Sequence, residues 1–140
     1  MAKTICKILG VVFLLVGLVG FVSPGFLGTH LSIVHNLVHL ISGAVALYLG
    51  FAGSLSAARL FCIVFGIVYL LLGICGFLLG GPAVPTVAGL ESMGSDSRLL
   101  RIIPHQLELG TMDHVVHVLL GIVFLIGGFL TKADVARATD

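Results

Sequence analysis

The stretch "CKILGVVFLLVGLVGF" (residues 6–21) recurs in altered form as "CIVFGIVYLLLGICGF" (residues 62–77). At this offset of 56 residues, eight of the sixteen positions are identical: Cys6/Cys62, Gly10/Gly66, Val12/Val68, Leu14/Leu70, Leu15/Leu71, Gly17/Gly73, Gly20/Gly76 and Phe21/Phe77. Long apolar stretches of this kind are typical of membrane-spanning helices. Three coincident glycines and a cysteine exceed what a shared apolar composition explains, so the match predicts an internal repeat.

A second pair of stretches extends the repeat. "VHLISGAVALYLG" (residues 38–50) matches "VHVLLGIVFLIGG" (residues 116–128) at an offset of 78. The identical positions are Val38/Val116, His39/His117, Gly43/Gly121, Val45/Val123, Leu47/Leu125 and Gly50/Gly128. The two offsets differ because the second unit carries a longer connection. The pattern predicts two helical hairpins, residues 4–53 and 60–131, which begin on the same side of a membrane and are related by a pseudo-twofold axis along its normal.

Composition supports a single membrane domain. The chain has 140 residues, of which 59% are hydrophobic and 9% charged, and its mean hydropathy is +1.24. Apolar blocks at about 8–22, 31–51, 60–79 and 115–130 approach the ~20 residues that a helix needs to cross a bilayer. We therefore expect an all-α, four-transmembrane-helix bundle with a loop at 80–112. A cleaved signal peptide is rejected for the first block, because the repeat requires this segment as half of a unit.

Basic residues predict the orientation. Five of the seven fall in segments that share one side of a four-span chain: Lys3, Lys7, Arg59, Lys132 and Arg137. By the positive-inside rule that side is cytoplasmic, so both termini are expected in the cytoplasm and the chain in the plasma membrane. The net charge of +1 gives no support for nucleic-acid binding. The lipid bilayer is the one partner that the sequence defines.

Glycines mark the expected helix contacts. Apolar helices in lipid associate mainly through close approach across small residues, because lipid offers no hydrophobic driving force between them. The predicted packing positions are Gly10, Gly17, Gly20, Gly43, Gly50, Gly66, Gly73, Gly76, Gly121 and Gly128. Cys6 and Cys62 are expected to act as small packing residues near the cytoplasmic face and not as a disulfide.

A polar cluster interrupts the second and fourth blocks. Its candidate residues are His35, Asn36, His39, Asp113, His114 and His117. Polar groups in hydrocarbon are costly unless they face the bundle interior and find partners. His39 and His117 occupy equivalent repeat positions and are expected to face each other. Asp113, four residues before His117, is expected to accept its imidazole N–H.

Four roles remain open for this cluster. It can be an interhelical hydrogen-bond network, or a site for Zn, Cu or a similar divalent cation at His39 and His117. It can hold a haem-like tetrapyrrole between these two histidines, with Gly43 and Gly121 providing room. It can also pass a small solute or a proton.

No catalytic residue is assigned, because the chain has no Ser-His-Asp order, phosphate-binding loop or CxxC pair. We expect a membrane protein without enzymatic activity, whose cluster is structural or ligand-binding. A haem- or metal-dependent redox membrane protein is the alternative.

The patterns "HNLVHLISG" (residues 35–43) and "IIPHQLELGTMDHVVHVLLG" (residues 102–121) resemble those of an uncharacterised bacterial family of small four-helix membrane proteins, known as a domain of unknown function. The resemblance covers most of residues 4–130, and its most specific elements are His39 with Gly43 and Asp113 with His117. It implies four spans and a plasma-membrane location, and no activity. His114 departs from the pattern, where an asparagine matching Asn36 is expected.

Overall fold

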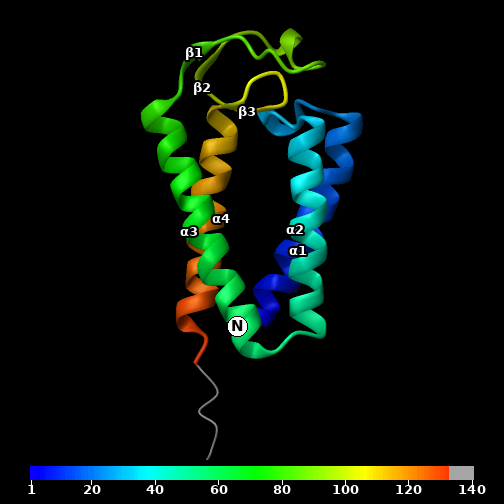
Figure 1. Cartoon of the computed structure of the whole chain (residues 1–140), viewed down its shortest axis with the longest axis vertical. Coiled ribbons are helices and arrows are strands. Elements are labelled where there is room, and N and C mark those ends of the chain that lie inside the picture. The colour runs from blue at the N-terminus through cyan, green and yellow to red at the C-terminus, as the bar shows by residue number, and fades with distance from the viewer. Residues whose placement is uncertain (133–140) are drawn as a thin grey trace, which may run out of the picture.

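The computed structural model describes residues 1–132 and is dominated by four helices (Figure 1). These are α1 (Ala2–Val22), α2 (Ile33–Phe51), α3 (Leu55–Leu79) and α4 (Thr111–Leu130). All four are long and apolar enough to cross a membrane. The expectation of four spanning helices therefore agrees with the structure. Arg137 lies outside the described residues.

Three of the helices begin earlier than the apolar blocks suggested. α1 starts at Ala2, α3 at Leu55 and α4 at Thr111, each including a first turn with polar residues that hydropathy alone omits. Serine side chains cap the starts of two helices. The Ser32 side chain accepts the backbone N–H of His35 at the start of α2. Ser54 likewise accepts the N–H of Ala57 at the start of α3. These bonds satisfy helix N–H groups that have no partner within the helix.

The segment expected to be a loop at 80–112 contains a small sheet, so the all-α expectation was incomplete. Strands β1 (Gly81–Ala83), β2 (Asp96–Ile103) and β3 (Leu107–Leu109) pair antiparallel in the order β1-β2-β3. Short 3-10 turns lie at η1 (Phe26–Gly28), between α1 and α2, and at η2 (Glu91–Met93). The sheet covers one end of the bundle, which we call the cap end (Figure 1).

A buried carboxylate organises this sheet. Glu108 on β3 is fully buried. It accepts the backbone N–H of Thr86 at 2.8 Å and the Thr86 hydroxyl, and its Oε1 lies 3.2 Å from Arg101 Nε on β2. These partners lie up to 22 residues away along the chain. Hydropathy periodicity does not reveal contacts of that range, which is why the segment reads as a loop.

Glycines form the contacts within each pair of adjacent helices, α1 with α2 and α3 with α4. A Cβ added to Gly10 would lie 2.8 Å from Leu47, and one added to Gly66 would lie 2.7 Å from Leu125. Both distances are too short for a side chain, so each helix approaches its neighbour across a bare backbone. Leu47 and Leu125 are 78 residues apart and Gly10 and Gly66 are 56 residues apart, so the two contacts correspond at the two offsets of the predicted repeat.

Aromatic and thiol side chains fill the space between the two helix pairs. Phe13 of α1 and Tyr69 of α3 stack with ring centroids 5.6 Å apart, and Phe124 of α4 lies about 6 Å from both. Nearer the opposite end, the Sγ atoms of Cys6 and Cys62 are 3.7 Å apart and fully buried. Most of the buried polar side chains of residues 1–132 lie toward the cap end, and Thr131 lies at the opposite end, where it bonds to Ala2 N and Gly127 O.

Candidate functional site

All six predicted cluster residues are buried, each at most 6% exposed. His35, Asn36 and His39 lie in the first two turns of α2, and Asp113, His114 and His117 in the first two turns of α4. Ser32 caps the start of α2, and Asp113 stands in the first turn of α4, so both helices begin just below the sheet. The structure therefore gathers both halves of the cluster at the cap end, where they form three arrangements, and His35 belongs to both the first and the third.

The first arrangement centres on Asp113. Its Oδ2 accepts the backbone N–H of Gly110 at 2.7 Å and that of His30 at 2.9 Å. The expected bond from His117 to this carboxylate is not formed within residues 1–132. Asp113 stands in the first turn of α4, so its side chain turns back to the unpaired N–H groups at the helix start. It thereby ties the α1–α2 connection to α4.

His30, in the connection between α1 and α2, also belongs to this arrangement. It is 1% exposed, and its Nδ1 lies 3.6 Å from Asp113 Oδ2. Its backbone oxygen lies 2.9 Å from His35 Nδ1. A carbonyl can only accept, so His35 Nδ1 carries the proton of this bond. His30 precedes the Ser32 cap, and no helical periodicity reaches it, so the sequence carried no signal for its burial.

The second arrangement seats two polar side chains on glycines. Asn36 lies directly over Gly20, and His114 lies directly over Gly76, so that neither glycine has room for a Cβ. Asn36 Nδ2 donates to Leu31 O at 3.4 Å, and His114 Nε2 donates to Arg98 O at 2.7 Å. Both side chains fasten a spanning helix to a connecting segment, which is a structural role.

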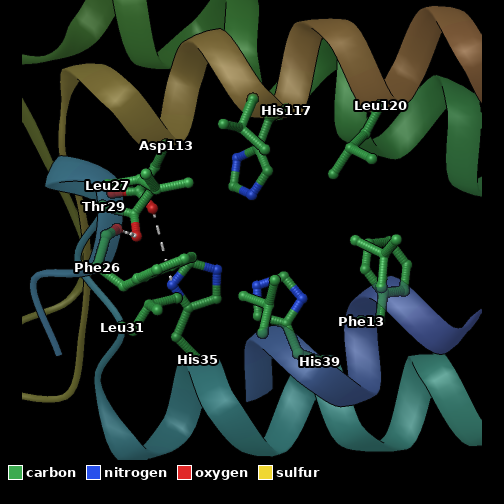
Figure 2. A pocket seen from close by; sticks show the side chains of 13 residues that line it. Phe13, Phe26, Leu27, Thr29, Leu31, His35, His39, Asp113, His117 and Leu120 are labelled. Atoms are coloured by element: carbon green, nitrogen blue, oxygen red, sulfur yellow. Dashed lines mark hydrogen bonds and ion pairs between the residues drawn. The ribbon is translucent and has the colours of Figure 1, made fainter. Parts of the chain in front are cut away.

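The third arrangement contains His39 and His117, whose rings make no hydrogen bond in the described part of the chain. The Nδ1 atoms of both are buried without a partner. Their neighbours are aromatic: Phe13 lies 5.3 Å from His39 and Tyr69 lies 5.2 Å from His117, between ring centroids. His35 stacks on His39 at 4.6 Å and meets His117 edge-on at 5.9 Å. The three histidine rings point toward one another (Figure 2).

Two cavities border these rings. The α1–α4 cavity, of about 100 Å³, is the one drawn in Figure 2. The α2–α3 cavity, of about 220 Å³, lies on the other side of the histidines and extends under β2 and β3. His35 and His117 line both. Partnerless imidazole nitrogens therefore stand beside two open spaces.

The arrangement does not suit the two cofactors that the sequence left open. Among residues 1–132, no three His, Cys, Asp or Glu side chains are positioned to hold a metal ion. The stacked rings of Phe13 and Tyr69 pack against His39 and His117 where a tetrapyrrole would need to lie.

Two carboxylates at the cap end are stabilised in their ionised form. Burial raises the pKa of Asp96, but bonds from the Thr111 hydroxyl and from the N–H groups of Arg98 and Thr111 outweigh burial and lower it below its ordinary value. Burial also raises the pKa of Glu108, and there the bonds from Thr86 and His105 and the charge of Arg101 lower it overall. Both carboxylates thus hold the cap together as charged acceptors.

Comparison with known proteins gives a family and no activity. The family model described as "Domain of unknown function (DUF4383)" matches residues 25–101, which is more than half of the 140 residues. The matched part includes His35, Asn36 and His39 but ends before Asp113 and His117. No curated protein and no solved structure matches the chain. The chain is a member of the DUF4383 family, with four helices able to span a membrane.

Proposed function

We propose that this chain is a non-enzymatic integral membrane protein that binds a small ligand at the histidine cluster of the cap end. The observation that carries this proposal is the state of His39 and His117, whose rings border cavities and make no hydrogen bond among residues 1–132, whereas His114, which also has an unpartnered Nδ1, is bonded through Nε2. A buried polar atom without a partner is costly in a low-dielectric interior. Such groups within spanning segments are commonly functional.

A purely structural role fits the other cluster residues better than it fits these two. Asp113, His35, Asn36 and His114 each make bonds to backbone groups that fasten helices to connections. A ligand with hydrogen-bonding capacity would supply the partner that His39 and His117 lack.

Passage of a solute or proton across the whole bilayer has less support. Below the histidines the core continues as Phe13, Phe124, Cys6 and Cys62, all of them essentially inaccessible. A packed apolar and thiol layer of this kind offers no chain of polar side chains toward the opposite end. Binding at the cap end is therefore the favoured role.

The proposed location is the plasma membrane, with the cap end outside and both termini in the cytoplasm. Lys3, Lys7 and Arg59 lie at the end opposite the cap. The cap end carries Arg98 and Arg101, and Arg101 is paired with Glu108. An excess of basic residues on the cytoplasmic side is the expected asymmetry of a spanning protein.

We also propose that the single domain is a duplicated hairpin with pseudo-twofold symmetry. Support comes from matched contacts. Asn36 over Gly20 corresponds to His114 over Gly76 when the offsets of 78 and 56 residues are applied. The ring pair Phe13–His39 corresponds in the same way to Tyr69–His117, with nearly equal centroid distances.

Ligand retention tests the proposal. The protein should be extracted from its native membrane directly into lipid nanodiscs, and bound small molecules identified by mass spectrometry alongside a visible spectrum and metal analysis. The double variant His39→Leu/His117→Leu should lose a molecule that the unaltered chain retains. The matched control His114→Asn, which copies Asn36, should keep it.

A Soret band or stoichiometric metal would replace the proposal with the redox alternative. If the unaltered chain and the double variant yield the same molecules in the same amounts, the cluster does not bind a ligand and the proposed function is wrong.

A further inference from the structure

We propose that the α2–α3 cavity is the ligand chamber and that it admits, sideways from the bilayer, an uncharged amphiphile whose head carries a hydroxyl or a carbonyl. This inference rests on the proposed function and names the class of molecule bound.

The two cavities can be compared position by position. Val12, Phe13, Val16, Val116 and Leu120 line the α1–α4 cavity. Their counterparts at offsets of 56 and 78 residues line the α2–α3 cavity: Val68, Tyr69, Leu72, Val38 and Ser42. The α2–α3 cavity is about twice as large. Two of the five pairs differ in polarity, because Tyr69 replaces Phe13 and Ser42 replaces Leu120.

Both replacements add a hydroxyl, and neither hydroxyl makes a hydrogen bond within residues 1–132. Tyr69 is 5% and Ser42 7% exposed, so only a small part of each residue is accessible. A serine within a helix can bond to the carbonyl four residues earlier, but Ser42 does not. Together with the partnerless His117 Nδ1, the hydroxyls of Ser42 and Tyr69 bring hydrogen-bonding groups from three helices to one chamber.

The charge of the chamber selects an uncharged head. No Lys, Arg, Asp or Glu is among its lining residues, whereas the α1–α4 cavity includes Asp113. A carboxylate or ammonium head would lose its hydration without gaining a counter-charge. A hydroxyl or carbonyl head can both fill the cavity and satisfy Ser42, Tyr69 and His117.

The remaining walls indicate the route of entry. Val38 of α2 and Val68 of α3 line the chamber and are nearly half exposed on the surface that faces lipid. At the cap end, Ile102, Leu107 and Leu109 of β2 and β3 cover it. A molecule dissolved in the bilayer can enter between α2 and α3, and its apolar tail can then lie against Val38 and Val68.

Tyrosine fluorescence gives a direct test, because the chain has no Trp and only two Tyr. Tyr48 is 65% exposed on the lipid-facing surface, so Tyr48→Phe leaves Tyr69 as the sole fluorophore. This full-length variant, in phosphatidylcholine vesicles, is titrated with a long-chain alcohol brominated next to its hydroxyl, since bromine quenches on contact. We expect saturable quenching by the bromoalcohol. Quenching by the bromoalkane and by the brominated fatty acid of the same length should be at least tenfold weaker.

Two substitutions at Ser42 localise the effect. Ser42→Leu copies Leu120 of the other cavity, and Ser42→Ala removes only the hydroxyl in case the larger residue disturbs folding. Both should weaken binding, so that the half-saturation concentration of the bromoalcohol rises at least tenfold. The matched control Leu120→Ser should leave it unchanged.

Equal quenching by the alcohol, acid and alkane would show lipid collisions only and would overturn the inference. Bromoalcohol binding unaffected by Ser42→Ala and Ser42→Leu would do the same. In either case, loss of a native molecule in His39→Leu/His117→Leu would still support ligand binding elsewhere in the cluster. Failure of both experiments would remove the proposed function as well.

Discussion

Substitution of His117 by Leu distinguishes a ligand site from a structural hydrogen-bond pair by the sign of its effect on stability. In the ligand-free protein, His117 Nδ1 is buried and unpaired. A structural pair predicts that Leu destabilises the bundle, because it leaves a former partner unsatisfied. The geometry predicts the opposite, because no partner exists to be left behind.

The magnitude follows from two opposing terms. Removing a buried polar atom that lacks a hydrogen bond recovers about 1–3 kcal/mol. Losing the ring contact with Tyr69, at 5.2 Å between centroids, costs about 0.5–1.5 kcal/mol. The free energy of unfolding of His117→Leu should therefore rise by about 1 kcal/mol.

Reversible unfolding by sodium dodecyl sulfate in mixed micelles, after ligand removal by detergent exchange, measures this change. His35→Leu is the matched control: it removes the donor to His30 O, so it should lower the free energy of unfolding by about 1–3 kcal/mol. The double variant His39→Leu/His117→Leu should be at least as stable as either single variant, because neither ring leaves a bonded partner behind. A loss of about 1 kcal/mol or more for His117→Leu, partly restored in the double variant, would refute the reasoning.

Three further outcomes are expected. Gly76→Ala should destabilise the bundle by about 1–3 kcal/mol in the same unfolding assay, because the added Cβ meets the His114 ring, whereas Gly81→Ala, which meets nothing within 4 Å, should be neutral. The lowered pKa of Glu108 implies that its contribution to cap stability is complete above its ordinary value of 4.5 and is lost as the pH falls through the lower folded pKa. Amide protection factors of β2 and β3, which compare each exchange rate with that of an unfolded chain at the same pH, should therefore stay constant below pH 6 and fall only at the acid end of a series from pH 6 to 3. A membrane-permeant oxidant such as diamide should link Cys6 to Cys62, seen as a loss of two hydrogens by mass spectrometry, because their Sγ atoms are 3.7 Å apart; Cys75→Ser should leave the link intact.

Much of this architecture could be predicted from the sequence because two strong regularities carry it. Hydropathy predicted four helices long and apolar enough to cross a membrane, because a hydrocarbon layer requires helices of about this length. The cost of burying polar groups in lipid predicted that His35, His39, Asp113 and His117 would lie inside the bundle, where they do lie.

What could not be predicted depends on partners far apart in the chain. Thr86, Arg101 and Glu108 meet only once the sheet exists, and none belongs to a periodic segment. The spacing of Asp113 and His117 suggested a bond between them, but the nearer N–H of Gly110 takes the carboxylate. Spacing along a helix predicts which side chains can meet and not which competing partner prevails.

The division of contacts between glycines and aromatic rings has a consequence for biosynthesis. Apart from Gly127, which packs on Ile5 of α1, the close glycine contacts between helices join neighbours in sequence, α1 with α2 and α3 with α4, so each pair can pack soon after its second helix is made. The contact of Phe13 with Tyr69 needs α3, and the contact of His35 with His117 needs α4. In a nascent chain that has only the first pair, Phe13 and His35 lack these partners. We therefore expect membrane quality-control proteases to recognise chains arrested at that stage.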